Sequence, residues 1–161
     1  MLSPKIQDAL NKQINAELFS SYLYLSMAAH FDSINLPGFA HWMKVQAKEE
    51  LGHAMKFYEH VTDRRGRVTL SAIAAPATQW KSPLAAFEAA FRHEQKVTGL
   101  IADLVKLAAA EKDNATGIFL QWFVTEQVEE EKQTDAVVHQ LKLVGDSAQI
   151  LMIDHALAQR E

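Results

Sequence analysis

The chain has 161 residues, no cysteine, a formal net charge of -4 and an isoelectric point near 6.0. This charge excludes a general nucleic-acid-binding protein, which needs a basic stripe, and without thiolates any metal must be held by oxygen and imidazole ligands. The composition, 48% hydrophobic with 6 glycines and 4 prolines, predicts a single domain of long helices over residues 1–161. No apolar run approaches the roughly 18 residues of a membrane span and no secretory signal is present, so we expect a cytoplasmic protein without membrane partners.

The first helix is predicted from about residue 4 to residue 32. Ser3 and Pro4 are typical of an N-cap followed by proline at the first helical position. Glu17 lies at the centre of the apolar face when successive residues are placed about 100° apart. Because burying an isolated carboxylate is costly, Glu17 must be paired, protonated or bound to a metal. The residues that share its face are Leu10, Ile14, Ser21, Tyr24, Ala28 and Phe31.

The second helix is predicted over about residues 37–65, after a short turn, with Gly66 as its C-cap. Glu50 and His53 lie about 60° apart on one face, so both can reach one metal ion. This Glu-x-x-His spacing is the one with which di-iron bundle proteins supply two ligands from one helix. The motif also fits a solvated face, and a lone buried histidine is usually satisfied by a neighbour. Because Glu49 and Glu50 flank His53 on the apolar side, we favour metal ligation.

Residues 67–82 contain Pro76, small residues and no helical period. At about 3.3 Å per residue, this segment can span roughly 50 Å, enough to return along a long helix. A linker between two domains is the alternative, but neither half of the chain has enough helices for its own core. We therefore predict a crossover that makes the second and third helices parallel.

The third and fourth helices are predicted over about residues 83–112 and 115–144. Glu94 is centred on the apolar face of the third helix. On the fourth helix we expect Gln127 and Glu129 at the two margins of the inward face, and Glu131 and Asp135 facing solvent. The inward stripe itself consists of Phe119, Trp122, Phe123, Glu126, Glu130, Val137, Leu141 and Val144.

Each of the four long helices carries acidic or amide residues near its midpoint. They are Glu17, Glu50, Glu94 and the segment 127–130. In an antiparallel bundle these positions meet at one level, where half-buried carboxylates would repel strongly. Carboxylates with one histidine form the ligand set expected for paired iron or manganese. A metal-free structural bundle would leave these acids without partners.

A short fifth helix is predicted over about residues 147–159, with Asp146 or Ser147 as its cap. Four helices already enclose a core, so its apolar side indicates packing against other subunits. Docking on its own bundle is the alternative. The apolar side consists of Ile150, Leu151, Ile153 and Leu157.

Over its whole length, this pattern resembles non-haem ferritins of the bacterial or archaeal type. The resemblance implies an all-α, ferritin-like four-helix bundle with a long crossover and a short fifth helix. It implies that Glu17, Glu50 and His53 bind a first iron, with Glu50 bridging to a second. The other implied positions are Glu94 and Glu130 as ligands of the second iron, Gln127 beside the pair, Tyr24 as an electron donor, and Glu49, Glu126, Glu129 and Glu130 as a third, looser iron site.

Two departures from related families matter. Bacterioferritins and most other di-iron bundles repeat Glu-x-x-His on the fourth helix, where this chain has Gln127 and Glu130. We therefore expect unequal iron positions, with the second iron held less tightly. Bacterioferritins also hold haem with a methionine just before the ligand histidine. That position is Gly52 here, so haem is not expected.

The implied activity is oxidation of Fe(II) by O2 or H2O2 at a di-iron ferroxidase centre within each subunit. The ferric product would be stored as mineral inside a hollow homo-oligomer of twenty-four subunits. By the same resemblance, Glu111, Asp113 and Gln121 could line a threefold pore. A rubrerythrin-like di-iron peroxidase is one alternative, although such proteins usually add a cysteine-ligated segment. A DNA-protecting mini-ferritin is another, although its iron site lies between subunits and it lacks a fifth helix.

Overall fold

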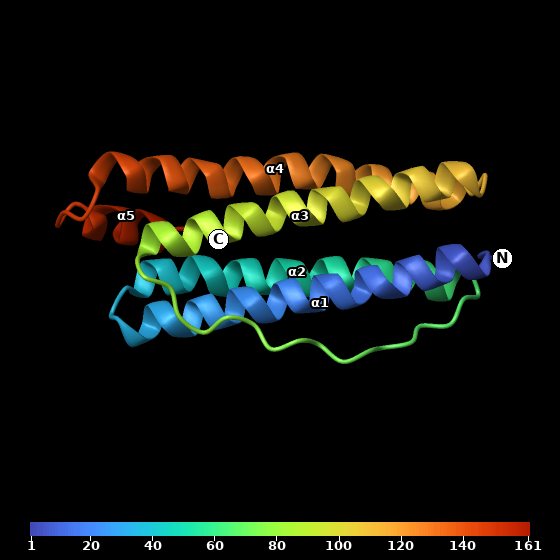
Figure 1. Cartoon of the computed structure of the whole chain (residues 1–161), viewed down its shortest axis with the longest axis horizontal. Helices are drawn as coiled ribbons and strands as arrows, with labels where there is room; N and C mark the ends of the chain where they lie inside the picture. The colour runs from blue at the N-terminus through green and yellow to red at the C-terminus, as the bar shows by residue number, and fades with distance from the viewer.

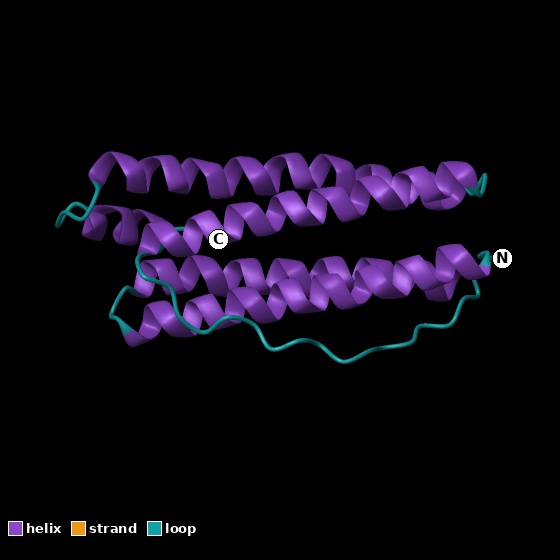
Figure 2. Ribbon diagram, viewed as in Figure 1, coloured by secondary structure: helices purple, strands orange, loops and turns teal.

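The computed structural model describes residues 1–161 as five α-helices without a strand (Figure 2). Four long helices lie side by side, with α1 packed mainly on α2 and α3 mainly on α4 (Figure 1). The predicted all-α bundle is thus confirmed. No helix is long and apolar enough to cross a membrane. The helices are α1 (Pro4–Ser33), α2 (Pro37–Asp63), α3 (Pro83–Ala110), α4 (Asn114–Val144) and α5 (Ile150–Leu157).

The predicted helix starts are capped by side chains. The hydroxyl oxygens of Ser3 and Ser82 accept hydrogen bonds from backbone N–H groups one turn later, and the carboxylate of Asp113 does the same for α4. These bonds satisfy backbone donors that have no partner within the helix. The caps therefore fix where three of the four long helices begin.

The ends of α2 and α3 differ from the prediction. Arg65 and Lys112 adopt positive φ angles of 59° and 54°, so both helices end about two residues earlier than expected. The left-handed residue after α2 is therefore Arg65 rather than the predicted Gly66. Gly66 donates its N–H to the carbonyl of Val61 at 2.8 Å. A Cβ on Gly66 would lie 2.9 Å from that carbonyl oxygen, so close approach accounts for the glycine.

The segment between α2 and α3 runs along the length of the bundle, and the two helices point in the same direction (Figure 1). Side chains of α1 hold it by hydrogen bonds to its carbonyl groups. Asn11 donates to Arg67 O at 3.0 Å, and Ser26 donates to Ala77 O at 2.6 Å. The predicted crossover is therefore present, and α2 and α3 have the predicted parallel arrangement.

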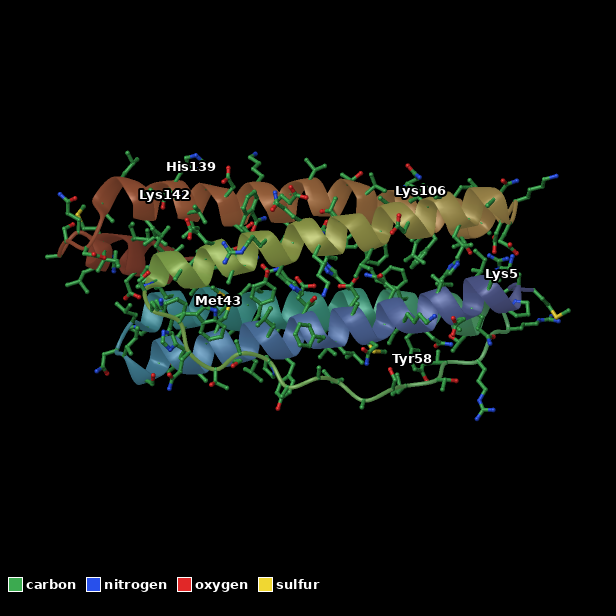
Figure 3. The ribbon with its side chains drawn as sticks, viewed as in Figure 1. Lys5, Met43, Tyr58, Lys106, His139 and Lys142 are labelled. Atoms are coloured by element: carbon green, nitrogen blue, oxygen red, sulfur yellow. The ribbon has the colours of Figure 1, made fainter.

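Apolar side chains form two separate cores, one toward each end of the bundle. The first is built around Phe31, Phe39 and Phe87, and the second around Phe57 and Phe123. Lys106 and Lys142, which are labelled in Figure 3, lie on the exposed surface of the bundle. The level between the two cores is occupied by buried polar residues. The bundle thus places its most polar interior at mid-length.

Helix α5 docks on its own bundle, against α2 and α4. Ile153 and Leu157 are buried, and the Asp154 carboxylate accepts a 2.9 Å hydrogen bond from the backbone of Phe39. The expectation that the apolar side of this helix packs on other subunits is therefore wrong for Ile153 and Leu157. Leu151, on the same predicted apolar side, is 59% exposed, and the neighbouring Met152 is 73% exposed.

Candidate metal centre

Five potential ligands, one or two from each long helix, meet between the two apolar cores. They are Glu17 of α1, Glu50 and His53 of α2, Glu94 of α3 and Glu130 of α4, and all five are buried. Ligand atoms of Glu17, Glu50 and His53 lie within 4.8 Å of one another, and so do those of Glu50, Glu94 and Glu130. Glu50 belongs to both groups. A carboxylate has two oxygens, so Glu50 is placed to bridge two cations.

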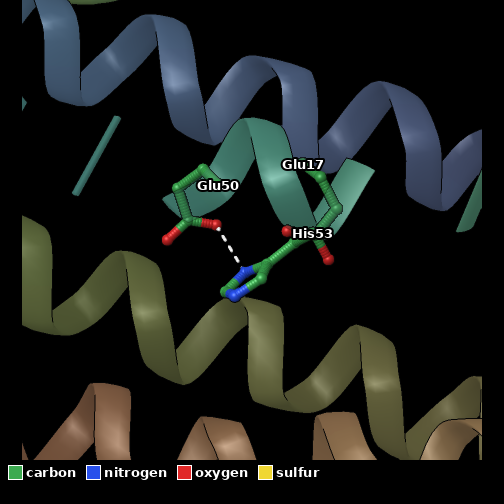
Figure 4. Close-up of side chains that lie close together, drawn as sticks. All are labelled: Glu17, Glu50 and His53. Atoms are coloured by element: carbon green, nitrogen blue, oxygen red, sulfur yellow. Dashed lines mark hydrogen bonds and ion pairs between the residues drawn. The ribbon is translucent and has the colours of Figure 1, made fainter. Parts of the chain in front are cut away.

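The first group has an acceptor without a partner. His53 Nδ1 lies 3.2 Å from Glu50 Oε2, while the Glu17 carboxylate faces the same space from α1 (Figure 4). Glu17 Oε2 is buried and makes no hydrogen bond. A buried carboxylate oxygen normally has a donor or a cation beside it. The unpartnered oxygen therefore fits a metal ligand.

The electrostatics of the cluster favour cation binding. Burial, and secondly the charge of Glu50, raise the pKa of Glu94 and of Glu130 to about 8. The same two causes raise the pKa of Glu17 well above its usual value. Burial lowers the pKa of His53, but the hydrogen bond and charge of Glu50 outweigh it, so the net shift is upward. A divalent cation would stabilise the ionised carboxylates and displace their protons.

Three buried amides hold the carboxylates in place. Gln13 Nε2 donates to Glu17 Oε1 at 2.8 Å. Gln46 Nε2 donates to Glu50 Oε1 at 2.7 Å and to Glu130 Oε2 at 2.8 Å. On α4, Gln127 Nε2 lies 3.2 Å from Glu94 Oε2. Such supporting bonds fix the orientation of ligand side chains before a metal binds.

Tyr24 is fully buried and donates its hydroxyl hydrogen bond to Glu94 Oε1. Burial, and secondly the charge of Glu94, raise the pKa of Tyr24 well above its usual value, so the phenol stays protonated. The phenol thus contacts a ligand of the second group directly. This places Tyr24 within reach of the chemistry that the cluster would perform.

The residues assigned to a third site are more dispersed. Glu126 Oε1 lies 3.8 Å from His53 Nε2, and Glu126 groups with His53 and Glu130. Glu49 instead pairs with Arg160 at 2.6 Å, and burial raises its pKa although Arg160 opposes this shift. Glu129 is exposed and accepts a hydrogen bond from Gln133. The structure therefore brings only Glu126 and Glu130 together with His53.

The orientation of α4 differs from the projection made from its sequence. Gln127 is buried rather than marginal, whereas Trp122, placed on the inward stripe, is 42% exposed. Glu131 does not face solvent freely, because its Oε1 accepts a 2.6 Å hydrogen bond from Thr98 of α3. The packing of α4 on α3 accounts for these differences, since it turns the Gln127 and Glu131 side of α4 toward α3.

The candidate pore residues have other partners within the subunit. Glu111 pairs with Lys5 at 3.4 Å, and Asp113 caps α4 while pairing with Arg64 at 3.0 Å. Burial raises the pKa of Asp113, but hydrogen bonds from Arg64 and Thr116 outweigh it and give a lowered pKa. Gln121 is exposed. Asp113 thus has a structural role at the turn between α3 and α4.

The structure adds residues to which the sequence assigned no role. Gln13 and Gln46 each precede a ligand glutamate by four residues and donate a hydrogen bond to it. The Gln-x-x-x-Glu spacing is visible in the sequence and could have indicated both supporting amides. A second pair, Ser20 and His93, forms a 2.8 Å hydrogen bond beside Tyr24. Arg160 reaches Glu49 across 111 residues of chain. No local spacing predicts that contact.

Comparison with known proteins places this geometry in a family. The family described as "Ferritin-like domain" matches residues 7–144. The chain is 48% identical to a "Bacterial non-heme ferritin" of Bacteroides fragilis over 160 residues, which cover 99% of this chain and 100% of that protein. It is 38% identical to a protein of the same name from Staphylococcus aureus over 95% of this chain and 92% of the other.

Solved structures agree over the full length. A structure described as "a novel open pore ferritin from the hyperthermophilic Archaeon Archaeoglobus fulgidus" is 52% identical, with a TM-score of 0.99 and 100% of both chains covered. A form of the Archaeoglobus fulgidus ferritin described as closed by site-directed mutagenesis is 53% identical, with a TM-score of 0.98 over 100% of this chain and 99% of the other.

Proposed function

The chain belongs to the ferritin family, and from this premise we propose that it oxidises Fe(II) at the buried carboxylate cluster and stores the ferric product as mineral inside a hollow homo-oligomer. The observation that carries the proposal is the position of Glu50, which is shared by the two ligand groups at the centre of the bundle. A bridging carboxylate can hold two Fe(II) ions close enough for both to give electrons to one oxidant.

The electrons balance in pairs. Each Fe(II) loses one electron, and O2 takes up two electrons and two protons to leave as H2O2. If H2O2 is the oxidant, two electrons and two protons convert it to two water molecules. The redox chemistry belongs to iron, while the protein supplies geometry and charge. Glu17, Glu94 and Glu130 release protons when they bind iron, because their pKa values are raised in the metal-free protein.

The two iron positions should be unequal. The first is served by Glu17, Glu50 and His53, and the second by Glu94, Glu130 and the bridging Glu50. At the second position Gln127 contributes an amide that donates to Glu94. The second position has no imidazole ligand, and the hydrogen bond from Gln127 occupies an oxygen of Glu94, so iron should bind less tightly there than at the first position. Tyr24 lies beside this second position and is proposed to supply an electron when oxidation needs one.

The third iron site should act after the first oxidation at the paired iron site. Glu126 is half-buried and Glu129 is exposed, so both remain more solvated than the paired ligands. We expect iron to bind more weakly there and to pass through in transit to the mineral. Changing Glu129→Ala or Glu126→Ala should leave the first fast oxidation largely intact while altering its stoichiometry. Loss of the first oxidation phase in stopped-flow absorbance would contradict this separation.

The central test is oxygen consumption per Fe(II) by the Glu50→Ala variant in a particle of verified size. Removing Glu50 takes a ligand from both ions, so rapid oxidation should nearly disappear. His53→Ala removes a ligand from the first ion only and should retain more activity. The folded protein should survive because relief of charge repulsion offsets part of the cavity left by Glu50. Wild-type kinetics in Glu50→Ala would overturn the proposed function.

Assembly is the second part of the proposal. By membership of the family, we propose a cage of twenty-four subunits. Leu151 and Met152 on α5 and Leu143 on α4 are exposed apolar side chains close to the C-terminus, and these fit a contact between subunits. Truncation after Gly145 should weaken or alter the cage. An unchanged particle in light scattering and electron microscopy would contradict a role of this segment in assembly.

The same experiments test two alternative functions. A rubrerythrin-like peroxidase would consume H2O2 without forming a mineral, and a DNA-protecting mini-ferritin would form a smaller particle. Full-length similarity to non-heme ferritins favours the storage function over both. Anaerobic Fe(II) titration combined with particle sizing measures stoichiometry and assembly together, and the particle size distinguishes the mini-ferritin. Mineral formation after addition of an oxidant distinguishes the peroxidase.

A further inference from the structure

Arg160 lies three residues after the end of α5, yet its side chain is only 14% exposed. The guanidinium carbon lies 4.2 Å from the centroid of the Trp42 ring, so the charged group stacks on an aromatic face of α2. Its Nη2 atom is 2.6 Å from Glu49 Oε2 and 3.3 Å from Gln133 Oε1. The last residues of the chain therefore reach back to the level of the candidate metal centre.

A third hydrogen bond connects Arg160 to the paired site. Arg160 Nη2 donates to Gln46 Oε1 at 2.9 Å. Because the amide oxygen faces Arg160, the amide nitrogen of Gln46 faces the opposite way, toward Glu50 and Glu130. Arg160 thus bonds both a residue assigned to the third site and the amide that supports the pair. A guanidinium is suited to this position, because it offers several donors in one plane.

The backbone around Arg160 is also anchored. His41 Nε2 lies 2.6 Å from the carbonyl oxygen of Arg160. Asp154 of α5 accepts a hydrogen bond from the first turn of α2. A Cβ on Gly38 would collide with the backbone carbonyl of Asp154, so this position must be glycine for α5 to approach so closely. The chain therefore holds the guanidinium beside Glu49 by contacts that do not involve Glu49 itself.

We propose that Arg160 is a built-in competitor for iron at the third site, a positioning residue that neutralises Glu49 until a cation displaces it. The inference rests on the proposed function, because it concerns the order in which iron fills the subunit. With Arg160 in place, Glu49 has a partner and the third site lacks one of its ligands. The paired site fills first, and the third site opens only when the concentration of divalent cation is high enough to release Glu49.

The test measures metal affinity site by site in the metal-free assembled protein. Arg160→Met keeps an apolar chain over Trp42 but removes the charge and all donors. Calorimetric titration with Co(II) should show the third site tightening by about tenfold in Arg160→Met. The two tight sites should change by less than about threefold. Arg160→Lys keeps the charge and should restore the weak third site of the wild-type protein.

Arg67→Met is the matched control, because it removes the same charge from an exposed position on the crossover. It should titrate like the wild-type protein. If Arg160 only anchored the C-terminus, Arg160→Met would lower thermal stability and leave the third site unchanged, and that result would overturn the inference. A failure of the wild-type protein to bind Co(II) at the pair would instead overturn the proposed function, so the two failures are distinguishable.

Discussion

Gln46 and Glu130 are 84 residues apart in the chain, yet Gln46 Nε2 donates to Glu130 Oε2 at 2.8 Å. The same nitrogen donates to Glu50 Oε1 at 2.7 Å. One buried amide therefore bonds carboxylates of α2 and α4 on facing sides of the candidate metal centre. It separates two acids that would otherwise face each other without a donor between them.

Replacing Gln46 should weaken metal binding without removing a ligand. Gln46→Leu keeps nearly the same volume but deprives Glu50 and Glu130 of their shared donor. Supporting residues around metal sites typically affect affinity by about tenfold to a hundredfold, and we expect the low end of that range. Co(II) titration calorimetry of the metal-free protein measures the effect. Gln121→Leu on the exposed face of α4 is the control, and equal affinities in the two variants would contradict the prediction.

Removing the phenol of Tyr24 should affect one iron position more than the other. The hydrogen bond from Tyr24 helps to lower the pKa of Glu94 against the effect of burial. Tyr24→Phe should therefore raise that pKa further and weaken the second metal position several-fold near neutral pH, while the first position is retained. A two-site titration at about pH 6.5 measures both. The exposed Tyr58 provides the control variant Tyr58→Phe, and equal weakening of both positions would count against this assignment.

The docking of α5 can be tested through two glycines of α2. A methyl group on Gly38 would collide with the carbonyl of Asp154, so Gly38→Ala should displace α5 and destabilise the fold by about 1–3 kcal/mol. Gly52 is mid-helix with nothing within 4 Å of an added Cβ, so Gly52→Ala should stabilise by about 0.5–1 kcal/mol. Denaturant unfolding of the metal-free protein measures both. Equal effects of the two changes would argue against the docked position of α5.

Helix periodicity and caps were sufficient to predict the bundle and to place Glu17, Glu50 and Glu94 on buried faces. Each of these depends on local spacing along one helix, which the sequence displays directly. The orientation of α4 could not be predicted as well, because its rotation depends on how it packs on α3. The contact between Glu49 and Arg160 could not be predicted at all, because it depends on the docking of α5 and on the path of the chain after it.

The metal-free protein should lose stability as pH rises across the range in which Glu94 and Glu130 titrate. Their pKa is raised from 4.5 to about 8, by burial first and by the charge of Glu50 second. Between these two values the folded state binds more protons than the unfolded state, so unfolding becomes easier as pH increases. The stabilising contribution is fully present below about pH 4.5 and is lost above about pH 8.

Thermal unfolding of the metal-free protein at about pH 5, 6.5 and 8 measures this loss. The double variant Glu94→Gln, Glu130→Gln keeps the side-chain volumes but cannot titrate at these positions. Relative to it, the midpoint of the wild-type protein should fall by more than about 4 °C from pH 5 to pH 8. Saturation with Co(II) should reduce the difference, because the cation takes the place of the protons. Parallel pH curves for the wild-type protein and the double variant would show that these two carboxylates do not hold protons in the folded state.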